Sequence, residues 1–362
     1  MNRRSFLLSS VSLLALPAFA DAIADAQANV DKYASPATAW DGPTTGPKAE
    51  SGKLVVVLAG DMKNGGHLGV TNGVQEAAAK AGWDVRVLDG AGSVQSRTAA
   101  FGQGLALQPA GIIIVGFDSV EQQAALDQAV AAKIPMVGWH SGAVIGANPG
   151  GGLSVNVSTD AMQVSQVAAE WAYIDAAGKP GVVIFTDSTY AIAIAKADKI
   201  KATIEALGGT VLEYVDTPIA ETSQRMPSLT TALLQKYGAS WTHALAINDI
   251  YFDFMGPALA AAGIAGDGAP KAVAAGDGSE GAYQRIRAGQ YQAVTVAEPL
   301  NLQGWQLVDE LNRAMAGEAA SGYMSPLHVV TKANIDFDGG DKNMFDPGNG
   351  YREAYAQIWS GM

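Results

Sequence analysis

Short, mostly apolar runs alternate with amphipathic helical patterns along most of this chain, and this alternation constrains the fold more than any other feature. The apolar runs lie at residues 54–59, 85–88, 112–115, 136–139, 153–157, 182–186, 210–215, 244–247, 272–275 and 293–297. Runs without polar alternation are typical of strands buried on both faces, and the helices between them can cover those faces. The pattern therefore predicts an α/β protein with parallel sheets.

The pattern also repeats. Residues 77–90 and residues 203–216 each run through a helix end, a glycine turn, a strand and a final aspartate. A chain of 362 residues is long enough for two domains with cores of their own. We therefore expect two Rossmann-like lobes with parallel sheets joined by a three-crossover hinge. The predicted N-terminal lobe comprises residues 52–156 and 298–327, the C-terminal lobe residues 157–297 and 328–362, and the crossovers lie near Asn156, Glu298 and Thr331.

Residues 1–20 have the order of a secretory signal. Arg3 and Arg4 precede an apolar stretch over 6–16, and a small-x-small sequence ends at Ala20. The stretch is shorter than the roughly 20 residues that span a bilayer. The arginine pair resembles a twin-arginine signal, with a general secretory signal as the alternative. We expect export to the periplasm and cleavage near Ala20.

Composition narrows the function further. The net charge is −12 without a basic cluster, which argues against a nucleic-acid partner, and the chain has no cysteine for thiol chemistry or disulfides. Residues 21–51 are rich in Ala, Pro, Thr and Gly and lack apolar periodicity. We therefore expect them to form an extended leader, with Trp40 as its anchor.

Polar and aromatic residues gather at the predicted carboxyl ends of the strands, where open parallel sheets bind their ligands. These candidate ligand-binding residues are Asn64, His67, Trp139, His140, Asn248, Asp249, Asp277 and Glu298. Carboxylates and amides can each exchange two hydrogen bonds with neighbouring hydroxyls, and aromatic rings suit the C–H face of a sugar. The set predicts a site for a small sugar or polyol.

Each of these residues also has a structural explanation. Asp249 and Asp277 could cap the helices that follow them. His67 and His140 could be ordinary surface or core histidines, and Trp139 could belong to a core. The functional interpretation depends on the convergence of several strand ends rather than on any one residue.

Five stretches together carry a family resemblance. They are residues 55–76 with Asn64 and Gly73-Val74-Gln75-Glu76, 129–139 with Ile134-Pro135, Ala246-Ile247-Asn248-Asp249, Gly276-Asp277-Gly278, and 294–299 followed by Gly304. From Lys53 to about Lys332, the chain resembles the periplasmic ribose- and galactose-type sugar-binding proteins that feed ABC importers. The resemblance implies two lobes that close on a ligand and a membrane permease as partner.

The resemblance also implies roles for single residues. Asn64, Asn248 and Asp277 look like the family's sugar-hydroxyl ligands, His67 falls where an aromatic ring is frequent, Glu298 falls at a hinge position where glutamine is common, and Lys196 falls near an arginine that contacts ligand. Three features depart from the family: His140-Ser141 replaces an Asp-Arg pair, Gly276 replaces a phenylalanine, and residues 336–362 extend past the usual end. They argue against ribose and leave the ligand class intact.

An exported NAD(P)-dependent oxidoreductase is the alternative function. Residues 276–281 match Gly-x-Gly-x-x-Gly between a strand and a helix, and Glu298 lies where an acid would bind a ribose. However, Asp277 would set a carboxylate against the pyrophosphate.

Other classes have less support. The chain has no Gly-x-Ser-x-Gly elbow, its four histidines lack metal-ligand spacing, and Asp336, Asp338 and Asp341 do not fit a calcium loop. A sugar-responsive repressor would need a DNA-binding headpiece where this chain has its signal. We therefore expect a non-catalytic monomer without cofactor or metal that binds a neutral sugar or polyol.

Overall fold

The first lobe is built on a six-stranded sheet whose central strands are almost wholly buried. The computed structural model describes residues 16–361, so the predicted twin-arginine pair lies outside the described residues. The strands are β1 (Leu54–Ala59), β2 (Asp84–Asp89), β3 (Gly111–Val115), β4 (Met136–Trp139), β5 (Gly146–Gly150) and β6 (Leu153–Val157), in the order β2-β1-β3-β4-β6-β5. All pairs are parallel except β5 with β6.

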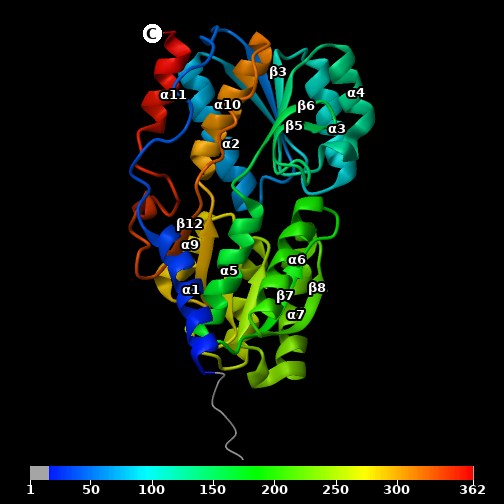
Figure 1. The fold of residues 1–362 in the computed structure, drawn as a ribbon. Helices are drawn as coiled ribbons and strands as arrows, with labels where there is room; N and C mark the ends of the chain where they lie inside the picture. The colour runs from blue at the N-terminus through cyan, green and yellow to red at the C-terminus, as the bar shows by residue number, and fades with distance from the viewer. Residues whose placement is uncertain (1–15, 362) are drawn as a thin grey trace, which may run out of the picture.

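The second lobe repeats this arrangement. Its strands are β7 (Gly181–Thr186), β8 (Thr210–Asp216), β9 (His243–Ala246), β10 (Lys271–Ala274), β11 (Gln292–Ala297) and β12 (His328–Thr331), in the order β12-β11-β10-β9-β7-β8. Only β12 is antiparallel to its neighbour. Read from β8, the order matches that of the first sheet over its first four strands, and each sheet then ends in an antiparallel edge strand. The two lobes are stacked end to end (Figure 1). The predicted α/β fold with two similar, mainly parallel lobes is confirmed.

Helices cover the sheets. Those of the N-terminal lobe are α2 (Gly65–Ala81), α3 (Val94–Ala106), α4 (Gln123–Ala131), α10 (Leu300–Ala316) and α11 (Tyr351–Ser360); those of the C-terminal lobe are α1 (Leu16–Ala34), α5 (Ala161–Asp175), α6 (Ala191–Ala206), α7 (Thr222–Tyr237), α8 (Gly256–Ala261) and α9 (Glu280–Ala288). Among residues 16–361, no helix combines the length and the apolar character needed to cross a membrane.

Glycines let α2 and α10 approach closely. A Cβ atom on Gly304 would lie 2.4 Å from the backbone carbon of Gly73, and one on Gly73 would lie 2.5 Å from the carbonyl oxygen of Asn301. This contact fixes α10, which follows the hinge residue Glu298, onto the N-terminal lobe. The chain crosses between the lobes after β6, after β11 and again before β12, so the third crossover precedes the predicted position near Thr331.

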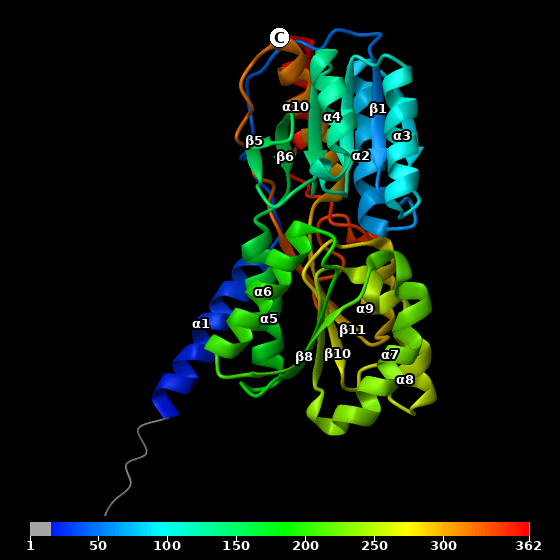
Figure 2. The same cartoon turned by 90° about the vertical axis from the view of Figure 1, so that its right-hand side faces the viewer.

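The predicted extended leader is wrong over its first part, because α1 continues to Ala34. Figure 2 shows α1 lying along α5 on the outside of the C-terminal lobe. Ala26 and Val30 are buried there, and the amide of Asn29 donates to Glu170 at 2.5 Å. Alanine favours helix, but its small side chain weakens the apolar periodicity that would reveal the buried stripe in the sequence.

The extended part of the leader begins after Ala34. Trp40 anchors it on the N-terminal lobe, with ring centroids 5.1 Å from Tyr323 and 5.2 Å from Tyr355. The leader therefore crosses from one lobe to the other.

The assignment of residues 328–362 to the C-terminal lobe is also wrong at its end. β12 belongs to that lobe, but α11 returns to the N-terminal lobe and packs against α2 and α10. Trp359 stacks on Trp305 with centroids 5.4 Å apart, and its indole donates to Asp309 at 2.9 Å. Aromatic residues spaced four apart form the apolar face of α11, so burial decides its position.

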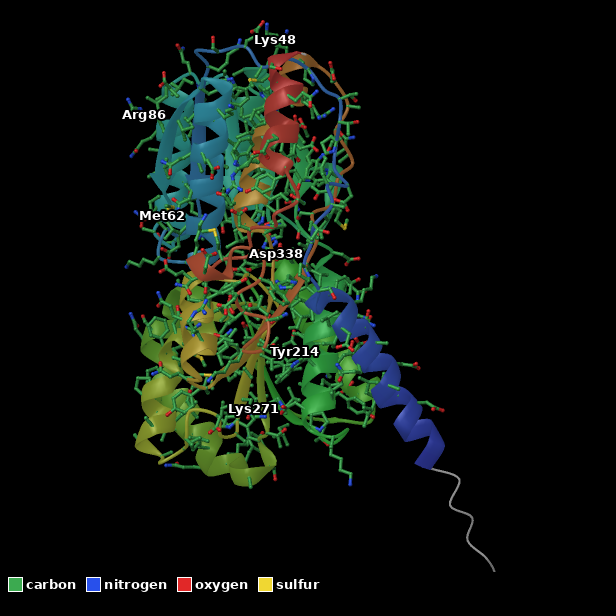
Figure 3. The ribbon with its side chains drawn as sticks, turned by 90° about the vertical axis from the view of Figure 1, so that its left-hand side faces the viewer. Lys48, Met62, Arg86, Tyr214, Lys271 and Asp338 are labelled. Atoms are coloured by element: carbon green, nitrogen blue, oxygen red, sulfur yellow. The ribbon has the colours of Figure 1, made fainter. Side chains whose placement is uncertain are left out.

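The two terminal segments meet as they cross between the lobes. Asp338 lies near the boundary between the lobes (Figure 3), and its Oδ2 accepts a hydrogen bond from the backbone N–H of Ala37 at 2.7 Å. The amide of Asn334 donates to the carbonyl of Ala34 at 3.0 Å. The lobes are therefore joined by these two segments in addition to the three crossovers.

Candidate functional site

The carboxyl ends of both sheets face each other across a cavity of about 420 Å³, including its opening to solvent. This is within the usual range for a small-molecule site. Its lining residues are His67, Gly116, Trp139, His140, Tyr190, Ile192, Ala193, Lys196, Ile219, Ile247, Asn248 and Asp277. Glu298 lies next to this set, whereas Asn64 lines a neighbouring cavity on the other side of Asp277.

His67 presents a neutral ring to the cavity. Its Nδ1 accepts a hydrogen bond from the backbone N–H of Asp61 at 3.0 Å, so the ring proton is on Nε2. Burial, aided by the charge of His140, lowers the pKa of His67 to about 3. The ring lies against Gly116, where a Cβ atom would be 2.1 Å from Nε2. His67 is therefore a fixed hydrogen-bond donor at neutral pH.

Trp139 supports the site rather than offering a free face. Its ring stacks on His140 with centroids 3.8 Å apart and meets the edge of His67 at 5.9 Å. Its indole donates to Gln303 at 2.8 Å. His140 has a left-handed backbone (φ +48°), which is uncommon for a residue other than glycine and is enriched at functional sites.

Glu298 connects the hinge to both lobes. Its Oε2 accepts hydrogen bonds from Gln303 at 2.9 Å and from the backbone of Thr159 at 3.4 Å, and lies 3.2 Å from Nε2 of His140. Its Oε1 lies 4.0 Å from the ammonium of Lys196. Burial raises the pKa of Glu298, but the charges of His140 and Lys196 outweigh it, so the pKa is well below its usual range. Glu298 is an ionised hinge residue.

Lys196 and Asp277 are buried in the cavity without hydrogen-bond partners. Among residues 16–361, none donates a hydrogen bond to the carboxylate of Asp277, and Lys196 makes only its long ion pair with Glu298. Burial raises the pKa of Asp277 to about 7, although the charges of Lys196 and His140 act against it. Buried charges are normally paired and hydrogen-bonded, so this pair needs further partners.

Two amides are also incomplete. The Oδ1 of Asn248 and the Nδ2 of Asn64 are buried without a partner in the described part of the chain. The Oδ1 of Asn64 caps α2 by accepting from Gly66 at 2.9 Å. Unpaired buried polar atoms are rare in folded proteins and call for an explanation. A ligand that carries both donors and acceptors would satisfy them.

Asp249, a predicted ligand-binding residue, lines the neighbouring cavity together with Asn64, and its carboxylate is held by its own chain. Its Oδ2 accepts hydrogen bonds from the backbone N–H groups of Asp277, Gly278 and Ser279 at 3.1, 2.8 and 3.0 Å. Its Oδ1 accepts from the amide of Gln292 at 2.7 Å. Both oxygens are therefore occupied in holding the turn that carries Asp277.

One metal-like cluster occurs among the described residues. His140, Asp277 and Glu298 place one ligand atom each within 4.8 Å of one another. The ammonium of Lys196 lies 4.0 Å from Glu298 and already supplies a positive charge there. A divalent cation would have to be accommodated beside that ammonium, so the cluster fits an internal ion network better than a metal site.

Sequence reasoning missed two kinds of site residue. The apolar walls Ile192 and Ile219 carry no signal that separates them from core residues. Gln303 joins Trp139 to Glu298 from the first turn of α10, where a buried glutamine on an apolar helix face is a detectable irregularity.

Residues 55–319 match the family of the periplasmic binding protein domain. The chain belongs to this family. Members of this family work in the periplasm. No curated protein matches the sequence.

Solved structures share the fold of this periplasmic binding protein at low identity. An ABC sugar transporter subunit from Rhodobacter sphaeroides 2.4.1 is 19% identical, with a TM-score of 0.67, over 78% of this chain and 99% of that chain. An ABC transporter solute binding protein from Agrobacterium vitis with bound allitol is 20% identical (TM-score 0.68; 79% and 97% covered). Another from Agrobacterium vitis, bound with alpha-D-tagatopyranose, is 17% identical (TM-score 0.70; 81% and 99% covered).

In this periplasmic binding protein, the Gly-x-Gly-x-x-Gly match is not a nucleotide site. The backbone N–H groups of residues 277–279, which would have to receive a pyrophosphate, already donate to Asp249. The family match and these hydrogen bonds give no support to the alternative of an oxidoreductase.

Proposed function

We propose that this periplasmic binding protein captures one small, neutral sugar or polyol between its lobes and delivers it to an ABC permease. The observation that carries the proposal is a set of buried groups at the cavity that lack hydrogen-bond partners among residues 16–361, namely Lys196, Asp277 and the Oδ1 of Asn248. Neighbouring hydroxyls can donate to the carboxylate and accept from the ammonium at the same time. The bound allitol and tagatopyranose of two structural relatives support this ligand class.

The charges support a neutral ligand. Among residues 16–361, the charges that act on both Asp277 and Glu298 from the basic side are those of Lys196 and His140, and only Lys196 is a lysine or arginine. An anionic sugar acid or sugar phosphate would meet like charges in a site shielded from solvent and would bind much more weakly.

The same geometry supports binding without catalysis. With a pKa of about 3, His67 is a poor proton acceptor at neutral pH, and Glu298 is held in hydrogen bonds within the hinge. Each of these groups has a binding or structural role, so we expect the protein to form a closed complex with its ligand and to leave the ligand unchanged. We propose that the protein acts as a monomer and that the permease recognises the closed form of its two lobes.

A thermal-shift screen of the mature protein tests the function. A ligand at 100 times its Kd should stabilise the fold by about 2.7 kcal/mol. Aldoses, ketoses and alditols form the test panel, and an aldonate and a sugar phosphate are the anionic controls. We expect one or more of the neutral sugars or polyols to raise the melting temperature of the protein, and neither anionic control to do so. Tight binding of either anion, or no response to any neutral sugar, would contradict the proposal.

Export is tested separately. We propose that cleavage near Ala20 leaves residues 21–34 as a helix on the C-terminal lobe, since Ala26 and Val30 are buried there. Replacing Arg3 and Arg4 with lysine should block export by the twin-arginine route. Normal export of that variant would assign the chain to the general secretory route.

A further inference from the structure

Tyr190 occupies an unusual position between the lobes. It follows the exposed residues Ser188 and Thr189 and immediately precedes α6, which begins at the boundary between the lobes (Figure 1). Its side chain packs against the hydrophobic cores of both lobes, including the N-terminal cluster that contains Phe101 and Phe117. It also lines the cavity. Tyr190 therefore lies between the two lobes, in the wall of the cavity at the start of α6.

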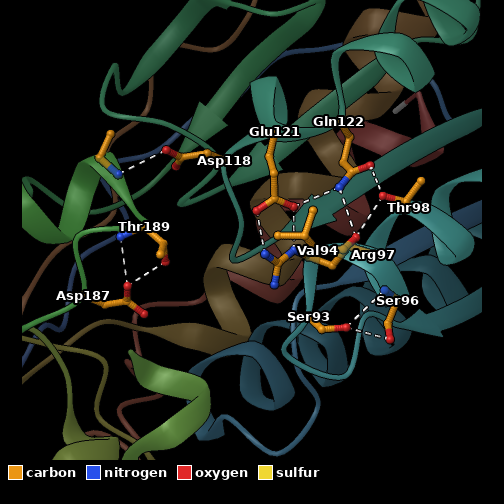
Figure 4. Close-up of polar contacts among 11 residues, drawn as sticks. Ser93, Val94, Ser96, Arg97, Thr98, Asp118, Glu121, Gln122, Asp187 and Thr189 are labelled. Carbon is orange, nitrogen blue, oxygen red and sulfur yellow. Dashed lines mark hydrogen bonds and ion pairs between the residues drawn. The ribbon is translucent and has the colours of Figure 1, made fainter. Parts of the chain in front are cut away.

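An aspartate of the opposite lobe holds this segment in place. The Oδ2 of Asp118 accepts a hydrogen bond from the backbone N–H of Ala191 at 3.1 Å (Figure 4). Ala191 is the first residue of the 16-residue helix α6, so the carboxylate also faces the positive end of the helix dipole. This bond can exist only while the lobes are together.

An arginine of the opposite lobe reaches the same place. Arg97 pairs with Glu121 through Nε and Nη2 at 2.8 and 2.6 Å (Figure 4), and it lies 5.5 Å from the ring centre of Phe117. Its charge acts on the hydroxyl of Tyr190. The ion pair with Glu121 holds the guanidinium in place within the N-terminal lobe.

The hinge lies at the other end of the site. Glu298 and Thr159, which belong to the crossovers, lie next to His140 and Asp277, whereas Ile192, Ile219 and Tyr190 line the cavity beside α6. These wall residues are hydrocarbon apart from the tyrosine hydroxyl. A ligand substituent that extends toward α6 would meet the ring of Tyr190.

We propose that Tyr190 is the size-determining residue of the ligand site, and that Asp118 acts as a positioning residue that holds the start of α6, and with it Tyr190, at the wall of the cavity. The inference rests on the proposed function, because it concerns the same cavity. It limits the ligand to a single sugar unit or a short polyol without a bulky substituent at that end. Removing the ring would leave the polar groups at the hinge end in place.

Size-graded probes test the inference. D-ribose, D-tagatose, D-galactose and allitol are titrated against lactose, sucrose and trehalose, with wild type, Tyr190→Ala and Tyr190→Phe compared by calorimetry and stopped flow. We expect wild type and Tyr190→Phe to bind only single units. Tyr190→Ala should gain at least tenfold in affinity for a disaccharide and release a single sugar at least tenfold faster. An unchanged size limit and release rate in Tyr190→Ala would overturn the proposal.

A second measurement does not depend on sugar binding. Hydrogen exchange reports the amide of Ala191, which donates to Asp118. We expect protection in wild type, Tyr190→Phe and the exposed control Asp127→Ala, and loss of protection in Tyr190→Ala and Asp118→Ala, with circular dichroism verifying the folds. If wild type binds no sugar but this pattern holds, the proposed function fails while the placement of Tyr190 stands. Equal protection in all five proteins would overturn the placement.

Discussion

Two neighbouring strands of the C-terminal lobe end in turns that each carry a buried aspartate, and the two aspartates differ in their partners. After β9, Asp249 accepts four hydrogen bonds from its own chain. After β10, Asp277 accepts none from any described residue and faces the cavity. The side chains are the same and the strands are adjacent, so residue type and position on the sheet edge do not separate a structural carboxylate from a binding one.

The two aspartates differ in whether their carboxylate oxygens accept hydrogen bonds within the protein. A buried carboxylate is costly unless it is paired and hydrogen-bonded. The carboxylate of Asp249 is hydrogen-bonded within the fold, and these hydrogen bonds orient the backbone that carries Asp277. The carboxylate of Asp277 has no hydrogen-bond donor among the described residues, and the hydroxyl groups of a ligand could supply one. One aspartate therefore positions the other.

The largest effect should follow Asp249→Ala. This change leaves the backbone N–H groups of Asp277, Gly278 and Ser279 without an acceptor, and it removes one of the two acceptors of the Gln292 amide. Each such group costs about 1–3 kcal/mol, so we expect a loss of at least about 3 kcal/mol of unfolding free energy. Urea unfolding measures it, with the exposed Asp267→Ala as matched control. A stability equal to that of the control would show that Asp249 does not hold the turn.

Asp277→Ala should affect ligand affinity instead of stability. Losing hydrogen bonds to one carboxylate should weaken sugar binding by about 1–3 kcal/mol, or roughly 5- to 150-fold. The melting temperature should not fall, because no protein donor loses a partner. Asn248→Ala should behave in the same way, because its Oδ1 also lacks a partner. Full affinity in either variant, measured by calorimetry, would remove that residue from the site.

The sequence predicts the sheets and the cavity well because both depend on local pattern. Mostly apolar runs locate the buried strands, and the carboxyl ends of parallel strands then converge by topology. The edge strands β5 and β12 carry no such apolar run of useful length, because Gly146–Gly150 is rich in glycine and His328–Thr331 is only four residues long. These two antiparallel edge strands are recognised by their neighbours, whereas the parallel edge strands β2 and β8 are recognised from their own sequences.

The roles of individual site residues depend on contacts that no local pattern contains. Asp249 binds backbone N–H groups that lie 28 to 30 residues further along the chain. The helix α1 depends on burial of Ala26 and Val30 against α5. In both cases, distant atoms decide the role, and a single sequence does not show them.

The pH dependence of stability should separate the two aspartates further. The pKa of Asp277 is raised to about 7 in the folded protein, against about 4 in an unfolded chain. Between these values the folded state retains a proton that the unfolded state has lost, so the stabilising contribution present below about pH 4 disappears as the pH rises through about 7. The groups whose charges act on Asp277 are Lys196, His140, Glu298 and Asp249.

Asp277→Asn cannot titrate and serves as the reference. Urea unfolding from pH 4 to 8 should show wild type losing stability relative to this variant as the pH rises, with a plateau above about pH 7. The histidines are present in both proteins, so their contributions largely cancel in the difference. Parallel stability curves would mean that Asp277 titrates normally.

The smallest effect concerns the hinge acid that acts on Asp277 from a distance. The negative charge of Glu298 is one cause of the raised pKa of Asp277, while Lys196 and His140 act in the opposite direction. Glu298→Gln removes that charge and frees Lys196 to act on Asp277 alone, so the pKa of Asp277 should fall. We therefore compare Glu298→Gln with the double variant Glu298→Gln/Asp277→Asn. The difference in their unfolding free energies should level off at a lower pH than the difference between wild type and Asp277→Asn. The amide oxygen of the new side chain can still accept from Gln303, so the hinge should keep its geometry and sugar affinity should change little. If the pH at which the stability difference levels off stays the same or rises, Glu298 does not act on Asp277 through its charge. The turns that carry Asp249 and Asp277 would then differ only in their hydrogen bonds.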